Sequence, residues 1–77
     1  MKVELHLYAT LRKFYPPQGG PLSMDLEDGS RVSYLLEHLG IPSDTPRVVL
    51  VNGRPADTDV VLREGDRVVL FPPVAGG

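Results

Sequence analysis

The chain closes with Gly76-Gly77, and these two residues make the strongest case for chemistry anywhere in the sequence. Glycine has no Cβ atom, so a pair of glycines forms a thread that fits a narrow active-site channel and adopts backbone angles that other residues avoid. Such a thread would present the terminal carboxylate of Gly77. We therefore expect that carboxylate to be the working group of the protein.

The residues before the glycines favour a projecting tail. They read Phe71-Pro72-Pro73-Val74-Ala75, and the prolines favour an extended chain that cannot curl back as a helix. Glycines also end many domains simply as a frayed terminus. Here the apolar run 68–71 leads into the prolines with no polar linker. We predict that the fold holds and projects residues 72–77 as an extended, flexible C-terminal tail.

The rest of the composition argues against most other kinds of site. The chain has no cysteine and only 2 histidines, which excludes thiolate nucleophiles and a convincing metal site. Its net charge of -2 gives no case for nucleic-acid binding. Asp57 and Asp59 stand close together, but their place in a loop indicates a turn. We expect no catalysis from this chain alone and no permanently bound cofactor.

Targeting and membrane signals are not apparent either. The first residues alternate like a strand and lack the apolar core of a signal peptide. No apolar stretch approaches the roughly 20 residues that span a bilayer. We therefore expect a cytoplasmic protein without a membrane partner.

The first third of the chain predicts a strand pair. Residues 3–8 and 22–27 alternate apolar and polar side chains, with the period of half-buried strands. Between them, residues 9–14 carry apolar side chains at helical spacing, and the proline- and glycine-rich segment 16–21 predicts a loop. The two strands should pair as a hairpin with a long loop.

One helix should follow. Ser30 is a good N-cap, and four apolar residues come after it at the spacing of a single helix face. This face consists of Val32, Leu35, Leu36 and Leu39. Gly40 and Pro42 should end the helix.

The second half of the chain predicts three more strands. Residues 48–51 are continuously apolar, which is typical of a strand buried on both faces. Asn52-Gly53 is a strong hairpin signal, so a short return strand should follow at 54–56. A turn at 63–66 should then lead into the last strand, residues 67–71.

These elements indicate a single α+β domain over residues 1–77. One mixed sheet would pack on one main helix, with the last and most apolar strand at its centre. This arrangement is the β-grasp, or ubiquitin-like, architecture. The fold alone does not decide the function.

Five segments form a recognisable pattern. They are Tyr8-Ala9-Thr10-Leu11-Arg12, Asp28-Gly29-Ser30, Val51-Asn52-Gly53, Glu64-Gly65-Asp66 and the final Phe71-Pro72-Pro73-Val74-Ala75-Gly76-Gly77. In these segments, and over its whole length, the chain resembles the sulfur-carrier proteins of the MoaD/ThiS family, most closely the small subunit of molybdopterin synthase. The final segment is the most specific, because the related thiamin carriers usually lack Phe-Pro-Pro.

The resemblance implies a chemistry for the tail. In that family an adenylating enzyme of the ubiquitin-activating type (MoeB-like) uses ATP to adenylate the last glycine. A sulfur donor, such as a cysteine desulfurase or rhodanese, then replaces AMP and leaves a thiocarboxylate. By this resemblance Gly77 would carry the sulfur, and the acyl-adenylate and thiocarboxylate would be transient states.

The resemblance also implies a partner for the loaded tail. The tail would insert into a large catalytic (MoaE-like) subunit, where sulfur passes to a cyclic pyranopterin precursor in molybdenum cofactor biosynthesis. The residues expected to bind partners are Phe71, Pro72, Pro73, Val74, Ala75 and Gly76. Phe71 is equally well explained as the last core residue of its strand.

Two other functions fit the same ending. One is a sulfur carrier for thiamin thiazole or for tRNA thiolation, which the Phe-Pro-Pro motif disfavours. The other is a ubiquitin-like modifier joined to lysines through Gly77, or a non-covalent binding domain that uses the sheet. Conjugation would leave isopeptide-linked adducts, whereas pure binding would survive deletion of Gly77.

Overall fold

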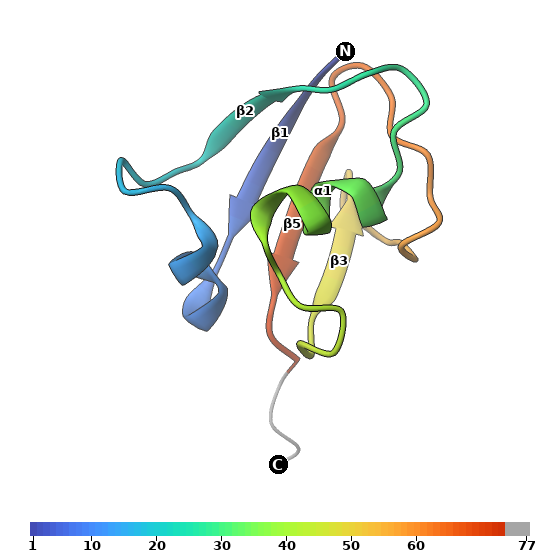
Figure 1. Ribbon diagram of the computed structural model, residues 1–77. Helices are drawn as coiled ribbons and strands as arrows, with labels where there is room; N and C mark the ends of the chain where they lie inside the picture. Colours follow the sequence, from blue (N-terminus) through green and yellow to red (C-terminus); the bar gives the residue numbers. More distant parts are fainter. Residues whose placement is uncertain (74–77) are drawn as a thin grey trace.

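The computed structural model describes residues 1–73 and shows a mixed five-stranded sheet with one helix packed across one of its faces (Figure 1). The strands are β1 (Lys2–Leu7), β2 (Leu22–Asp25), β3 (Val48–Val51), β4 (Arg54–Pro55) and β5 (Arg67–Phe71). The helices are η1, a short 3₁₀ helix (Ala9–Phe14), and α1 (Val32–Leu39). The predicted order of elements is confirmed. None of the helices in this described part is long and apolar enough to cross a membrane.

The last strand lies at the centre of the sheet, as predicted. The strand order is β2-β1-β5-β3-β4, and Leu70 of β5 has Leu7 of β1 beside it in parallel and Val49 of β3 beside it antiparallel. Because β1 and β5 are parallel, both finish at the same end of the sheet, opposite the N-terminus (Figure 1). The chain therefore leaves the sheet from its middle strand.

The core lies between the sheet and α1. Most of its fully buried side chains come from β1, α1 and β5, which the sequence pattern had singled out, and Leu11 of η1 and Leu62 before β5 complete it. The largest of them include Val3, Leu5, Val32, Leu35, Val68 and Leu70. The predicted apolar face of the helix is confirmed, with Leu39 packed at the margin of the core.

The two ends of α1 are formed differently. Gly40 ends the helix in the left-handed conformation, with φ of 77°, as predicted. The prediction that Ser30 is the N-cap is wrong, because the N-cap is Arg31 and no side chain caps the helix. Instead, the N–H groups of Val32 and Ser33 donate to backbone carbonyls of the 58–60 segment, at 3.0 and 2.9 Å. Backbone carbonyls of a loop that is distant in the sequence therefore accept the hydrogen bonds that a capping side chain was expected to accept.

The hairpin after β3 is confirmed, but the predicted burial of β3 is not. Asn52 and Gly53 adopt positive φ values of 53° and 82°, as a tight hairpin turn requires. Only Val49 of β3 is buried, and its three other residues are half-buried. The reason is that α1 covers one face of the sheet and no described element covers the other.

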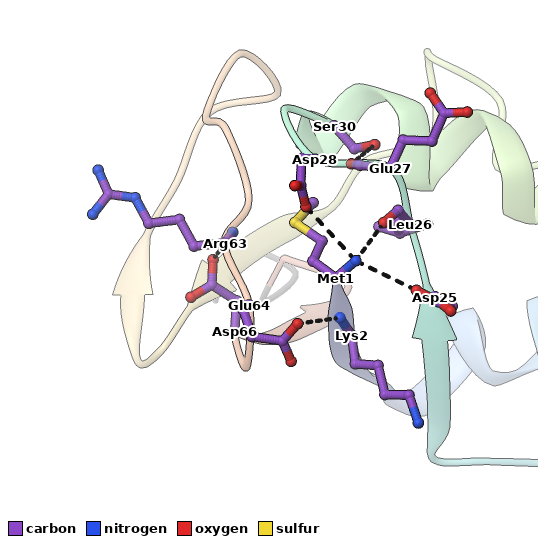
Figure 2. A network of polar contacts seen from close by, with 10 residues as sticks. All are labelled: Met1, Lys2, Asp25, Leu26, Glu27, Asp28, Ser30, Arg63, Glu64 and Asp66. Atoms are coloured by element: carbon purple, nitrogen blue, oxygen red, sulfur yellow. Dashed lines mark hydrogen bonds and ion pairs between the residues drawn. The ribbon is translucent and has the colours of Figure 1, made fainter.

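Backbone and carboxylate contacts fasten the end of the sheet where β1 and β5 begin (Figure 2). The Met1 ammonium donates to the carbonyl of Leu26 at 2.8 Å, next to the end of β2. The Lys2 N–H donates to Glu64 Oε1 at 3.0 Å, and the Gly65 N–H donates to the Lys2 carbonyl at 2.7 Å. These bonds tie the start of β1 to β2 and to the turn before β5.

The loop over residues 16–21 has a structural role that the sequence did not reveal. The pairing of β1 with β2 ends at Leu5, so β2 does not bond to the N–H of Leu7. This N–H donates instead to the hydroxyl of Tyr15 at 2.7 Å. Gly20 lies against the Tyr15 ring, so closely that a Cβ at this position would collide with it. The absence of a side chain at Gly20 therefore allows the loop to pack against the Tyr15 ring.

Candidate functional site

The last strand delivers the start of the tail to the edge of the uncovered face of the sheet. Phe71 ends β5 directly opposite Val48 of β3 and is half-buried. Pro72 is half-buried as well, and Pro73 is exposed. Of the residues predicted to bind partners, these three belong to the described structure. Val74, Ala75, Gly76 and the predicted sulfur-bearing Gly77 lie outside the described residues.

Alternation along β5 sends its side chains to two different environments. Val68 and Leu70 face the core and are fully buried. Val69 and Phe71 face the uncovered side. Phe71 is therefore not part of the buried core, which was one of the two explanations for it.

The uncovered side of the sheet carries a continuous apolar surface that reaches the tail. We call it the open face, and it consists of His6, Tyr8, Val48, Leu50, Pro55, Val69 and Phe71. Leu50 lies opposite Val69, and Val69 lies beside His6. The rings of His6 and Tyr8 are stacked, with centroids 6.4 Å apart. Tyr8 is 51% exposed and extends the surface at the end where Phe71 leads into the prolines.

Polar side chains border the open face at the opposite end. Glu4 Oε2 lies 3.6 Å from Arg67 Nε, and Glu4 Oε1 lies 3.0 Å from His6 Nε2. Further along, the side-chain amide of Asn52 donates to Asp66 Oδ1 at 2.8 Å. Apolar side chains thus cover the end of the open face next to Phe71, and polar and charged side chains cover its opposite end.

The described residues offer a surface and an exit for the tail, and no enclosed reaction centre. Within residues 1–73 no polar or charged side chain is buried, and no group of three or more His, Asp or Glu residues could hold a metal. Asp57 forms the turn predicted for it, with its carbonyl accepting the Val60 N–H at 3.1 Å. The open face and the end of β5 therefore form a surface suited to docking.

Sequence reasoning predicted that the last strand leads directly into Phe71-Pro72-Pro73, but it missed the open face. The signal was present: Val69 and Phe71 alternate with Val68 and Leu70, and a single helix can cover only one face of a sheet. The apolar run 48–51 led away from the open face, because a continuous apolar strand is typically buried on both faces of a sheet. Here the second apolar side faces outward.

Comparison with known proteins adds a family. The model of the ThiS family matches residues 5–77, a range that begins within β1 and includes all the later strands and the last residues of the chain. A search among curated proteins finds no match.

Three solved structures show how widely the fold is shared. A Pyrococcus furiosus protein described as molybdopterin converting factor, subunit 1, is 28% identical (TM-score 0.76), with 95% of this chain and 98% of that chain covered. Small archaeal modifier protein 1 of H. volcanii is 25% identical (TM-score 0.76), with the same coverages, 95% and 98%.

A chain from the complex of subunits 1 and 2 of the Helicobacter pylori molybdopterin-converting factor is 21% identical (TM-score 0.65) over 100% of both chains. These similarities confirm the ubiquitin-like β-grasp predicted from the sequence.

Proposed function

The chain belongs to the ThiS family, and we propose that it is the sulfur carrier of a heteromeric molybdopterin synthase, with Gly77 as the sulfur-bearing residue. The observation that carries this proposal is the course of β5, which runs through the centre of the sheet and brings Phe71-Pro72-Pro73 to the rim of the open face. A partner that accepts the tail would meet this apolar surface beside it.

The chemistry proposed for Gly77 needs two steps. A carboxylate oxygen attacks the α-phosphorus of ATP in a MoeB-like adenylating enzyme, and pyrophosphate leaves. In the second step the outer sulfur of a persulfide on a donor such as a cysteine desulfurase or rhodanese attacks the acyl carbon, and AMP leaves. A thiol then attacks the donor sulfur of the resulting acyl disulfide, which releases the thiocarboxylate and leaves a disulfide on the donor. The product is a thiocarboxylate, whose soft sulfur is a better nucleophile than the original carboxylate.

The contribution of the folded part is to position this terminus. When the folded part is docked on its partner, the reaction between the tail and the bound substrate becomes effectively intramolecular. Docking therefore removes much of the entropic cost of the reaction. Phe71 is the aromatic residue nearest the tail, and partly exposed aromatic side chains often supply a large share of interface energy. We propose a large, MoaE-like subunit as the partner, supported by the H. pylori complex of subunits 1 and 2.

The pathway is tested with the loaded carrier. The protein is prepared with a C-terminal thiocarboxylate and mixed separately with a molybdopterin synthase large subunit plus pyranopterin precursor, with a thiazole synthase, and with a tRNA-thiolating enzyme. We expect sulfur to leave the carrier and a dithiolene to form in the first mixture. Transfer only in one of the other mixtures would keep the carrier chemistry and overturn the molybdopterin assignment.

A second candidate is protein modification, which the similarity to small archaeal modifier protein 1 favours. An amine from a lysine would attack the same activated acyl group, AMP would leave, and an isopeptide bond would form. Expression in a host that contains the activating enzyme, followed by proteolysis and mass spectrometry, separates the two. Lysines of other proteins linked to Gly77 would support modification, and a free thiocarboxylate without such adducts would support sulfur transfer.

A further inference from the structure

We propose that the free edge of β2 is a second binding site, which takes an extended peptide of alternating apolar and basic side chains as an added strand of the sheet. β2 lies on the far side of β1 from β5 (Figure 1). The proposal therefore concerns a different surface from the open face and the tail, and it does not depend on the carrier function.

The backbone of β2 directs hydrogen-bonding groups outward at two positions. Met1 and Leu26 form a hydrogen-bonded pair, because each donates from its nitrogen to the carbonyl of the other at 2.8 Å. Such pairs alternate along an antiparallel ladder, so the residues two and four positions before Leu26 also turn their groups toward β1. Ser23 and Asp25 must then point their N–H and C=O groups away from the sheet.

The other edge of the sheet is much less suited to pairing. β4 has only two residues, and one of them is Pro55, which has no N–H to donate. A short edge strand with proline is a common protection against unwanted strand addition. β2 has four residues, none of which is proline. An added strand would therefore form its ladder at β2.

On the helix side of β2 there is a groove for apolar side chains. Its volume is about 310 Å³, and it lies between η1, β2 and the end of α1. Its apolar lining consists of Phe14, Pro16, Leu22, Met24 and Leu39. Four of these side chains are only partly buried at the margin of the core, so they keep apolar surface available for a ligand.

On the opposite side of β2 there is an open hollow in the surface with acidic surroundings. It also measures about 310 Å³, and Lys2, Glu4, Ser23 and Glu64 contribute to its lining. Asp25 follows on the same face, and its side chain is 78% exposed. Two of these carboxylates have cationic neighbours, because Asp25 lies 3.4 Å from the Met1 ammonium and Glu4 lies 3.6 Å from Arg67 Nε. Asp28 is a further carboxylate, 3.8 Å from the same ammonium. The carboxylates of Glu4, Asp25, Asp28 and Glu64 therefore outnumber the cations of Met1, Lys2 and Arg67 by one, which favours a basic side chain. Because residues of a strand alternate between faces, a bound strand would place apolar groups in one hollow and basic groups by the other.

The test uses a short synthetic peptide in which leucine alternates with arginine, titrated into the isotope-labelled full chain and followed by NMR. We expect saturable shifts of the Ser23 and Asp25 amides. Two comparison peptides should bind at least about tenfold more weakly: one with the same residues in non-alternating order, and one with glutamate in place of arginine. Equal binding of either peptide, or shifts confined to the open face, would overturn the proposal.

Variants at the edge make the test specific. Ser23→Pro removes the outward N–H and should weaken binding about tenfold, because proline is tolerated at an edge position whose N–H faces outward. Ser23→Ala keeps the N–H and should bind like the wild type. If Ser23→Pro fails to fold, Asp25→Lys replaces it, with an expected weakening of about fivefold that grows smaller at high salt.

Unchanged affinity in the folded edge variant would contradict the proposed site. A concentration-dependent dimer that protects the Ser23 and Asp25 amides without peptide would also contradict it, and would assign the edge to a second copy of the chain.

Discussion

The two ends of the sheet are held together in different ways. Where β1 and β5 begin, polar contacts dominate: Arg63 donates its N–H to Asp66, and Met1 and Lys2 bond to the neighbouring segments (Figure 2). The side chains of Asn52 and Asp66 also bond to each other at this end. Where β5 finishes, Phe71 and its neighbours form a half-buried apolar surface.

This difference follows from the parallel pairing of β1 and β5. Because the two strands start at the same end, the turns and termini that bond to their first residues lie there, and Phe71-Pro72-Pro73 lies at the opposite end. Substitutions at the polar end should therefore lower stability while partner binding is kept. Substitutions at the tail end should lower partner binding while stability is kept.

The largest effect is expected from the terminus itself. Deleting Gly77, or adding a residue after it, should abolish sulfur loading and transfer, because the carboxylate to be activated is displaced or lost. The melting temperature should stay the same, since residues 1–73 already form the sheet, the helix and the buried core. Thermal unfolding and a sulfur-transfer assay check this together. Full activity of the truncated chain, or loss of its fold, would contradict the account.

Two adjacent residues of β5 give a sharper comparison. Leu70→Ala should lower the free energy of unfolding by about 3 kcal/mol, because this side chain is fully buried. Phe71→Ala should change it by less than about 1 kcal/mol yet weaken binding to the large subunit more than about tenfold, because Phe71 lies on the open face. Chemical denaturation and calorimetric titration measure the two quantities. A similar stability loss in both variants would remove the proposed division of roles.

At the polar end, Asp66→Ala should lower the free energy of unfolding by about 1–2 kcal/mol. The substitution removes the acceptor for the Asn52 side chain and for the Arg63 N–H, each at 2.8 Å. Asp44→Ala, at an exposed position in a loop, is the matched control and should change stability by less than about 0.5 kcal/mol. Affinity for the partner should be the same in both variants, and a selective loss in Asp66→Ala would show that docking reaches this end.

The smallest effect is expected at the end of β1. Tyr15→Phe removes the hydroxyl that accepts the Leu7 N–H, at a cost of about 1 kcal/mol. Faster amide hydrogen exchange at Leu7 should report the same loss locally. An unchanged exchange rate would mean that the hydroxyl does not protect this group.

Most of the fold could be predicted because the signals were local. Alternation gave β1 and β2, one apolar helix face gave α1, and Asn52-Gly53 gave the hairpin. The helix start was mispredicted because its N–H groups bond to carbonyls of the 58–60 segment, almost thirty residues away, and no local pattern records such a contact. The Tyr15 hydroxyl bond escaped prediction for the same reason.

The candidate site was only half predictable. The exit of the chain through Phe71-Pro72-Pro73 could be predicted, since proline restricts the backbone whatever its surroundings. The prediction for the two glycines lies outside the described residues. The open face depends on which strands become neighbours. His6 and Val69 are far apart in sequence and adjacent in the sheet, so their shared surface appears only once the pairing of β1 with β5 is known.

The central claim is that Gly77 is loaded with sulfur, and mass spectrometry of the intact protein tests it most directly. The chain is incubated with ATP, an adenylating enzyme of the ubiquitin-activating type and a sulfur donor. The account predicts the mass increase for replacement of one oxygen by sulfur, located by fragmentation at Gly77 and absent without ATP. An unchanged mass, or sulfur found at any other residue, would contradict it.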